Sequence, residues 1–248
     1  MRTEAETRWA QSVTRLGPLW LCRRPGNGFI TYRNLAGMAD LNDLVRKALA
    51  TFATDPDVIE VEWKTRGHDH APGLADALAA HGFVAGEPES IMIGEAAGLD
   101  VPIALPPGVT VRAVTAPEDV RAASLLADEV FDTTPDEAMA RTMAARVADD
   151  PALQVWAAFA GDEVIGSGRV EGVPGTDFAG LWGGITRPQW RGQGIYRALT
   201  AGRARAALAM GHRLLHSDAT AFSRPILERN GLRRVSTTTP YTWRRPAR

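Results

Sequence analysis

The chain has 248 residues, of which 45% are hydrophobic and 23% are charged, and its formal net charge is −1. This length suggests one large domain or two small ones, and the balanced charge gives no electrostatic reason to bind nucleic acid or an anionic membrane. The single cysteine, Cys22, excludes an internal disulfide framework and a thiolate metal cluster. The first residues lack the apolar core of a signal peptide, and no stretch reaches the roughly 20 apolar residues of a membrane span, so we expect a cytoplasmic protein.

Signals for secondary structure are weaker in the first hundred residues than in the rest of the chain. Apolar residues spaced along one helical face predict a helix over 41–52. Strands are predicted at 58–63 and 89–94, on either side of a short helix at 73–83. Residues 95–108 contain small residues and prolines without a helical period, so we place a domain boundary there.

Two domains are therefore expected, a smaller α/β domain at 1–100 and a second domain at 101–248. In the second domain, alternating apolar residues predict a strand at 109–113. Capping-box patterns with early prolines, which begin at Thr115 and at Thr134, predict the starts of two helices.

A series of three strands follows these helices. Residues 153–172 alternate in hydrophobicity and turn at Gly161, which predicts a hairpin. The third strand ends near Thr186, and Gly183 and Gly184 inside it indicate a bulge or a close backbone approach.

The last elements of the two domains share one order, helix, strand, helix and strand. In the second domain this order begins with a helix from Ile195 and includes a short helix closed by Gly231. Leu78 and Leu227 each stand four residues before the glycine that closes their helix. We infer that residues 1–100 are a degenerate, partial repeat of the second domain.

The stretch "PQWRGQGIYRAL" places two glycines, Gly192 and Gly194, immediately before a predicted helix. The start of a helix has unpaired N–H groups and roughly half a positive charge, and glycines there let the backbone curl around an anion. The stretch is not a P-loop, because one residue separates its glycines and no lysine follows them. It also lacks the third glycine of the dinucleotide fingerprint, since Arg197 stands at that position.

The stretch resembles the acyl-CoA motif Gln/Arg-x-x-Gly-x-Gly/Ala of the GCN5-related N-acetyltransferase (GNAT) superfamily. The order of elements is similar from Pro107 to Arg248, and the motif residues are specific at 183–198 and 220–232. The resemblance implies a GNAT fold, with a mixed, mostly antiparallel central sheet flanked by helices. It also implies transfer of an acetyl group from acetyl-CoA, as co-substrate, to an amine by direct attack on the thioester.

The resemblance assigns cofactor-binding roles to particular residues. Backbone groups of Ile185 and Thr186 would pair with the pantetheine arm. Backbone N–H groups would hold the pyrophosphate at Arg191, Gly192, Gln193, Gly194, Ile195 and Tyr196. Tyr196 departs from the motif, which has Gly or Ala there, and its ring packs either over the cofactor or beneath the helix; we favour packing beneath the helix.

The candidate catalytic residues are less well defined. Many family members have a tyrosine acid four residues before the helix-closing glycine, where this chain has Leu227. Tyr241 or Ser223 could replace that acid, or the thiolate could leave unaided. Glu171 is the best-placed base, with His216 and Asp218 as alternatives, and deprotonation through water would need no side chain.

We expect no metal, because His68, Asp69 and His70 are too few ligands for a closed site. The expected partners are a small-molecule or peptide amine, with no nucleic acid and no membrane, and the chain is expected to be a monomer or homodimer. The alternative function is a non-catalytic acyl-CoA-binding sensor or partner module, which the leucine at position 227 favours.

The connection between the first two helices of the second domain is acidic. In the GNAT fold this connection walls the acceptor side, and here it contains Asp132, Asp136 and Glu137. Asp136 and Glu137 could simply stabilise the start of their helix, whereas nothing in the sequence gives Asp132 such a role. The pattern predicts a cationic amine acceptor.

Overall fold

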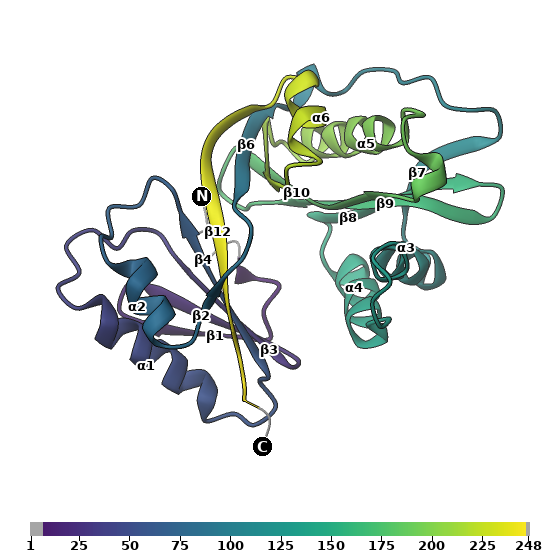
Figure 1. Ribbon diagram of the computed structural model, residues 1–248. Helices are drawn as coiled ribbons and strands as arrows, with labels where there is room; N and C mark the ends of the chain where they lie inside the picture. The colour runs from purple at the N-terminus through teal and green to yellow at the C-terminus, as the bar shows by residue number, and fades with distance from the viewer. Residues whose placement is uncertain (1–6, 247–248) are drawn as a thin grey trace. The chain divides into compact units, whose positions relative to one another are not determined.

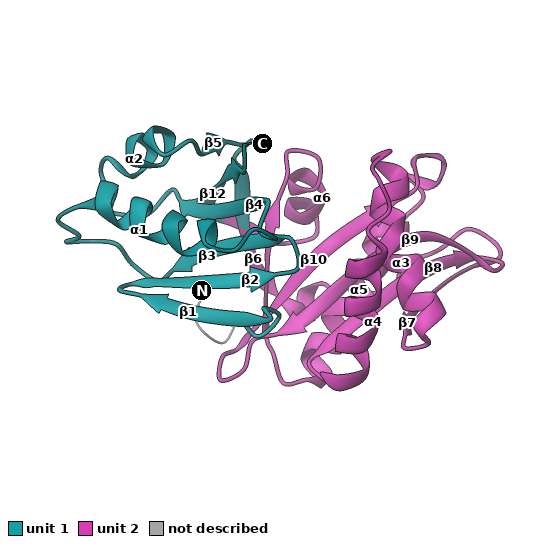
Figure 2. Ribbon diagram, turned by 90° about the horizontal axis from the view of Figure 1, so that it is seen from below, with its two compact units in different colours: residues 1–91, 235–248 teal, residues 92–234 magenta. Residues whose placement is uncertain are grey.

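The computed structural model describes residues 7–246, which form two compact units (Figure 2). Unit 1 contains Met1–Ile91 and Val235–Arg248, and unit 2 contains Met92–Arg234. Unit 2 thus includes residues 92–100, which precede the expected boundary, while the end of the chain belongs to unit 1.

None of the helices between residues 7 and 246 is both long enough and apolar enough to span a membrane. Residues 1–6, on which the expected absence of a signal peptide partly rests, lie outside the described residues. The cytoplasmic location and the oligomeric state stay predictions.

Unit 1 is a sheet with two helices on one face (Figure 1). Its strands are ordered β1-β2-β3-β4-β12, and β5 pairs with β12. The helices are α1, Leu41–Ala53, and α2, Leu74–Ala80. The strands are β1 (Ser12–Leu16), β2 (Leu19–Arg24), β3 (Asn27–Tyr32), β4 (Glu60–Arg66), β5 (Val84–Ala85) and β12 (Arg233–Arg244). Sequence analysis found the helices and β4 but did not predict the strands before α1.

Unit 2 is a mixed sheet covered by helices on both faces, and this confirms the predicted fold class. Its strand order is β6-β11-β10-β9-β8-β7, in which β7 to β10 are antiparallel and β10 pairs parallel with β11. Helices α3 and α4 lie on one face, and α5 and α6 lie on the other (Figure 1). The strands are β6 (Glu89–Glu95), β7 (Val109–Val114), β8 (Leu153–Ala160), β9 (Glu163–Gly172), β10 (Phe178–Thr186) and β11 (Leu214–Ala219). The helices are α3 (Pro117–Val130), α4 (Glu137–Asp149), α5 (Ile195–Ala209) and α6 (Arg224–Arg229), with 3-10 turns at Ala96–Gly98 and Pro188–Trp190.

Helix α5 packs closely against the sheet because glycines line the facing strands. A Cβ added at Gly168 on β9 would lie 2.6 Å from Nη1 of Arg203, and one added at Gly184 on β10 would lie 2.9 Å from the Tyr196 ring. Gly202 on α5 itself leaves room for the ring of Trp156. These three glycines therefore set the distance between helix and sheet.

The two units end their short second helices in the same way. Gly82 after α2 and Gly231 after α6 both have positive φ, 81° and 97°. In unit 1 the N–H of Phe83 donates to Leu78 O, and in unit 2 the N–H of Leu232 donates to Leu227 O, each over 3.0 Å. Both are Schellman-type ends, so the residues that suggested an internal repeat do perform equivalent structural roles.

Replacing Gly168 by alanine should destabilise the protein by about 1–3 kcal/mol, because the methyl group would displace the buried Arg203 side chain. Urea unfolding of G168A checks this. G98A is the matched control, since nothing lies within 4 Å of a Cβ at Gly98, and it should stay within about 0.5 kcal/mol of the parent. Equal stability of G168A and the parent would contradict the close packing of α5.

Candidate functional site

Strands β10 and β11 diverge halfway along their length. Their ladder joins Phe178–Gly180 to Leu214–His216, yet β10 continues to Thr186 and β11 to Ala219. At the point of divergence, the Ser217 hydroxyl donates to the carbonyl of Leu181 over 2.9 Å. Beyond it, the backbone edge of β10 is available to another extended chain.

A β-bulge interrupts β10 just past this point. Trp182 pairs with Arg169 and Ile185 pairs with Ser167, so the two glycines between them face a single residue of β9. Gly183 has a φ of +59°, and both Gly183 and Gly184 are exposed. The bulge was predicted from these glycines, and it presents bare backbone where the strands separate.

The loop from 187 to 194, which we call the glycine loop, leads from β10 into α5. Gly192 and Gly194 have φ values of +77° and +84°, and Gly194 is the N-cap of α5. Within residues 7–246, no hydrogen-bond acceptor faces the backbone N–H groups from Gly192 to Arg197. The N–H of Arg191, which was also predicted to face the pyrophosphate, instead donates to Pro188 O over 3.2 Å.

A row of free N–H groups at the positive end of a 15-residue helix is an anion-binding arrangement. Residues 121–225, which include this loop and the diverging strands, match the model of the acetyltransferase (GNAT) family. Residues 121–225 are a GNAT domain.

Solved structures show the same fold over nearly the whole chain. A GCN5-related N-acetyltransferase from Kribbella flavida is 18% identical with a TM-score of 0.71, covering 95% of this chain and 90% of that one. A tandem GNAT protein from the clavulanic acid biosynthesis pathway is 15% identical with a TM-score of 0.63, covering 95% and 83%. A GCN5-related N-acetyltransferase from Sphaerobacter thermophilus is 18% identical with a TM-score of 0.62, covering 93% and 78%. No curated protein matches the sequence.

Coverage of this extent means that the N-terminal half is GNAT-like in fold as well. In unit 1, β3 and β4 correspond to the diverging pair, since their parallel ladder runs from Asn27–Glu60 to Ile30–Trp63 and both strands continue beyond it. Here, however, Arg66 bridges the two strands, with Nη1 donating to Tyr32 O over 2.6 Å. The divergence in unit 1 is sealed by a side chain.

The helix start in unit 1 is also blocked. The carboxylate of Asp40 accepts the N–H of Asp43 over 2.8 Å at the N-terminus of α1. A negative side chain therefore already occupies the place where the GNAT domain of unit 2 offers bare N–H groups.

Tyr196 in the GNAT domain packs beneath α5. Its ring lies against Gly184 on the sheet and joins the core cluster formed by β10, β11 and α5. The hydroxyl interacts with Arg203, whose side chain is only 1% exposed. Burial lowers the pKa of this guanidinium, and the charge and hydrogen bond of Tyr196 oppose that shift.

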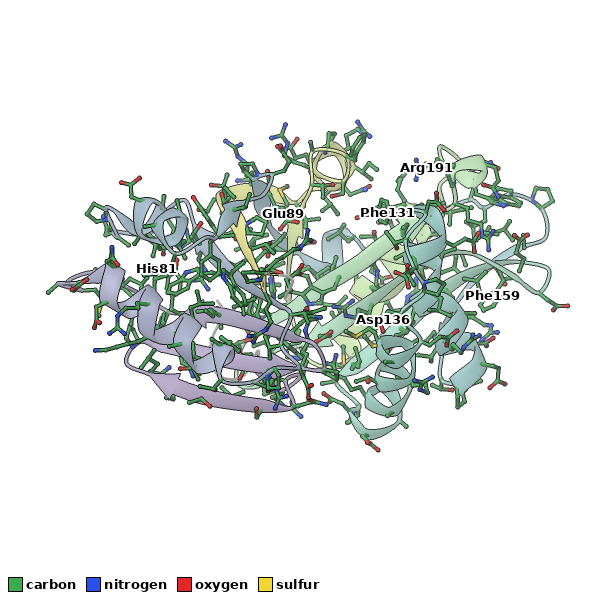
Figure 3. All side chains as sticks on the ribbon, turned by 60° about the horizontal axis from the view of Figure 1, so that its bottom comes forward. His81, Glu89, Phe131, Asp136, Phe159 and Arg191 are labelled. Carbon is green, nitrogen blue, oxygen red and sulfur yellow. The ribbon has the colours of Figure 1, made fainter. Side chains whose placement is uncertain are left out.

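Two further groups lie around the glycine loop. Thr186, at its start, is buried, and its hydroxyl has no hydrogen-bond partner among residues 7–246. Arg191 folds back, with Nε donating to Thr186 O over 3.2 Å, and Figure 3 labels this side chain.

The segment before β7 passes the start of α5. A Cβ added at Gly194 would lie 3.2 Å from the carbonyl oxygen of Ala104. Between this segment, α5 and the end of α6 is a cavity of about 350 Å³. It is lined by Gly98, Leu99, Val101, Ile103, Arg197, Thr200, Arg229, Asn230 and Gly231. The two arginines make its wall basic.

On the opposite face of the sheet, Glu171 lies between two arginines. Its carboxylate accepts from Arg169 Nε over 2.7 Å and from Arg146 Nη2 on α4 over 3.2 Å. Burial would raise the pKa of Glu171, but the charges and hydrogen bonds of Arg169 and Arg146 outweigh it and hold that pKa below its usual value. A carboxylate held in this way is a weak base.

The other predicted catalytic residues lie in different surroundings. His216 is 3% exposed on β11, with Trp182 and Phe178 edge-on to its ring at 5.3 and 6.1 Å between centroids. Leu227 is part of the core. Tyr241 is in the β12 segment of unit 1, opposite Trp63, and packs against the core of that unit.

The acidic connection between α3 and α4 is largely engaged in local structure. Asp136 caps α4 by accepting the N–H of Met139 over 2.8 Å, and Glu137 pairs with Arg121. Asp132 has a φ of +52° directly after α3, which is the left-handed position that ends many helices. Figure 3 labels Asp136 at α4 and the exposed Phe131 at the end of α3. The carboxylates of Asp136 and Glu137 therefore have structural roles, whereas Asp132 is distinguished by its left-handed backbone.

Sequence reasoning missed the arginines of this domain. Arg146, Arg169 and Arg203 were not among the residues predicted to form a site. A signal was present, because the alternating glycines at 166 and 168 on a buried strand indicate that something large approaches it. Groups of His, Cys, Asp and Glu that could hold a metal ion do not occur among residues 7–246.

The ion pairs of Glu171 predict a pH-dependent contribution to stability. Because its folded pKa is below the unfolded value of about 4.3, the stabilisation is complete above that pH and is lost as the pH falls through the folded pKa. E171Q should therefore be less stable than the parent by about 1–3 kcal/mol at pH 7, and the gap should shrink below pH 4.

Urea unfolding of E171Q and the parent from pH 7 to pH 3 measures this gap. D177N is the control, because Asp177 is paired with Arg213 at the surface and its loss should change stability much less. A gap for E171Q that does not depend on pH would contradict the assigned ion pairs.

Proposed function

We propose that the GNAT domain is an acetyl-CoA-dependent N-acetyltransferase that acts on an amine of a small molecule or peptide. The observation that carries the proposal is the row of N–H groups from Gly192 to Arg197, which have no acceptor in the described chain. These groups suit the pyrophosphate of acetyl-CoA. The neighbouring basic cavity, with Arg197 and Arg229, suits the remaining nucleotide portion.

The diverging strands suit the other end of acetyl-CoA. The part of β10 beyond its ladder with β11, which includes Ile185 and Thr186, would accept the pantetheine arm as an added strand. The exposed backbone at Gly183 and Gly184 would then lie beside the thioester. In the transfer, the amine nitrogen bonds to the carbonyl carbon, the C–S bond breaks, and the thiolate of CoA leaves.

Proton transfer in this mechanism uses water as the first acceptor. The low pKa of Glu171 makes its carboxylate a weak base, and His216 is buried among aromatic rings. Leu227 supplies no acid, so the thiolate leaves unaided. The role of Glu171 in this proposal is to hold Arg146 and Arg169 in position.

The alternative is a non-catalytic acyl-CoA-binding module, which the apolar residue at 227 favours. Both functions require acetyl-CoA to bind, and only the first releases free CoA in proportion to acetylated amine. Measuring CoA thiol release with a panel of amines separates them.

Replacing Gly192 by valine should weaken acetyl-CoA binding at least tenfold. A Cβ at this position meets nothing within 4 Å, so the effect comes from the loss of the positive φ that turns the N–H groups toward the ligand. Titration calorimetry measures the affinity. G175V is the control, because Gly175 also has a positive φ, +71°, with open space around it but lies in the turn before β10. Unchanged affinity in G192V would remove the proposed cofactor loop.

The protein should bind one acetyl-CoA per chain. The counterpart site in unit 1 is filled by the Arg66 side chain and capped by the Asp40 carboxylate, so it offers no N–H row. The molar ratio in the same calorimetric titration checks this. A ratio of two acetyl-CoA per chain would contradict the inference that unit 1 does not bind the cofactor.

A further inference from the structure

Arg169 lies over the bulge of β10 on the face covered by α3 and α4. It is the cross-strand partner of Trp182, and a Cβ added at Gly183 would lie 3.2 Å from its Nη1. Arg169 shares this face with Glu171 two residues on, and Glu171 contacts α4 through Arg146. A guanidinium thus stands beside the exposed backbone at which the proposed reaction takes place.

The guanidinium is fixed at one edge and open at the other. Nε donates to Glu171 over 2.7 Å, whereas neither Nη group donates to any residue between 7 and 246. The side chain as a whole is 34% exposed. Glu171 itself is less exposed, at 19%, and is shared with Arg146.

The side chains around the bulge include more positive groups than negative ones. Arg146 and Arg169 share the single carboxylate of Glu171, and Arg203 lies on the other face of the sheet, close enough to Arg169 for their charges to repel. Asp218 is a negative group on β11, beyond the point where the strands diverge. Arg169 and Arg203 therefore place two guanidinium groups at the bulge, one on each face of the sheet. Their charge favours an anion between the diverging strands.

We infer that the acceptor is a small molecule with a carboxylate next to its amino group, of the α-amino acid type, and that Arg169 binds this carboxylate. The inference rests on the proposed acetyl transfer. The planar Nη edge matches a carboxylate through two parallel hydrogen bonds. Because Nη1 lies beside Gly183, a carboxylate bound there places an amine only a few bonds away at the thioester.

This assignment distinguishes the two acceptor classes that the sequence left open. The N-terminal amine of a peptide is followed by an amide, which has no charge to offer Arg169. A free amino acid has a carboxylate at the same place. The inference differs from the cationic acceptor expected from the α3–α4 connection, where Asp136 is engaged in capping and Glu137 in an ion pair.

The test compares matched acids and amides as acceptors. α-Amino acids with aliphatic, aromatic, acidic and basic side chains are each paired with their α-carboxamides, and CoA thiol release gives kcat/KM for both. At least one acid should exceed its carboxamide by about 100-fold, as expected for a charge-assisted pair. Binding of each acid to the CoA complex is measured in parallel by thermal shift.

The inference is overturned if carboxamides are acetylated as well as acids, or if no acid in the panel is acetylated or bound. Acetyl-CoA affinity, measured separately by calorimetry, tells the two proposals apart. Loss of CoA binding would contradict the N-acetyltransferase itself, whereas tight CoA binding without a preference for acids would contradict only the role of Arg169.

Variants at position 169 test the residue directly. R169Q should reduce the acid-over-amide ratio to about threefold or less, mainly through KM for the acid, and R169K should restore part of it. R213Q, which changes an exposed arginine paired with Asp177, should leave the ratio unchanged. A uniform loss of activity toward acids and amides in R169Q would mean that Arg169 is only structural.

Because R169Q removes a partner of Glu171, its folding is checked by thermal unfolding. If R169Q does not fold, the double variant R169Q/E171Q replaces it. Both members of the Arg169–Glu171 ion pair are then neutral amides, so neither leaves the other with an unpaired charge. The same ratio of kcat/KM values decides the outcome.

Discussion

The close approach of α5 to the sheet is the constraint on which the GNAT domain depends. Glycines at 168 and 184 remove the side chains that would hold the helix away, and Gly202 does the same on the helix. Because the helix lies so near, its first turn is placed at the end of β10, and the left-handed glycines that precede it turn their N–H groups outward. A helix set farther from the sheet would separate the N-terminal turn of α5 from the bulge, which receives the thioester in the proposed reaction.

The same packing explains an otherwise unfavourable feature, a fully buried arginine. Arg203 is surrounded by Gly168, Thr200 and Tyr196, and its Nε donates to the carbonyl of Leu199 over 3.0 Å. Placing a cation in a core costs free energy unless its donors are satisfied. Here the Arg203 guanidinium places positive charge beneath the bulge, on the side of the sheet opposite Arg169. In unit 1 a cation on a strand, Arg66 of β4, bridges the diverging strands instead.

Much of this domain could be predicted because its signals are local. The glycine loop, the bulge at Gly183 and Gly184, and the closing turn at Gly231 each follow from a backbone conformation that glycine adopts most easily. The arginine arrangement could not be predicted in full. Arg169 and Glu171 lie two residues apart on β9, but Arg146 reaches Glu171 only because α4 packs against the sheet. The left-handed backbone of Asp132, with a φ of +52°, could not be predicted for a similar reason, since it depends on where α3 ends. Tyr241 was considered for the acetyl-transfer site, although β12 carries it into the core of unit 1.

The assignment of β12 to unit 1 has a consequence for how the chain folds. Residues 238–244 pair with β4 along its whole length, so the sheet of the first unit is incomplete without a segment that follows unit 2 in the sequence. Unit 2, in contrast, is continuous from 92 to 234. Unit 2 is therefore formed by one uninterrupted segment, whereas β4 presents an open edge until β12 pairs with it. The sheet of unit 1 is closed by a strand from beyond the other unit.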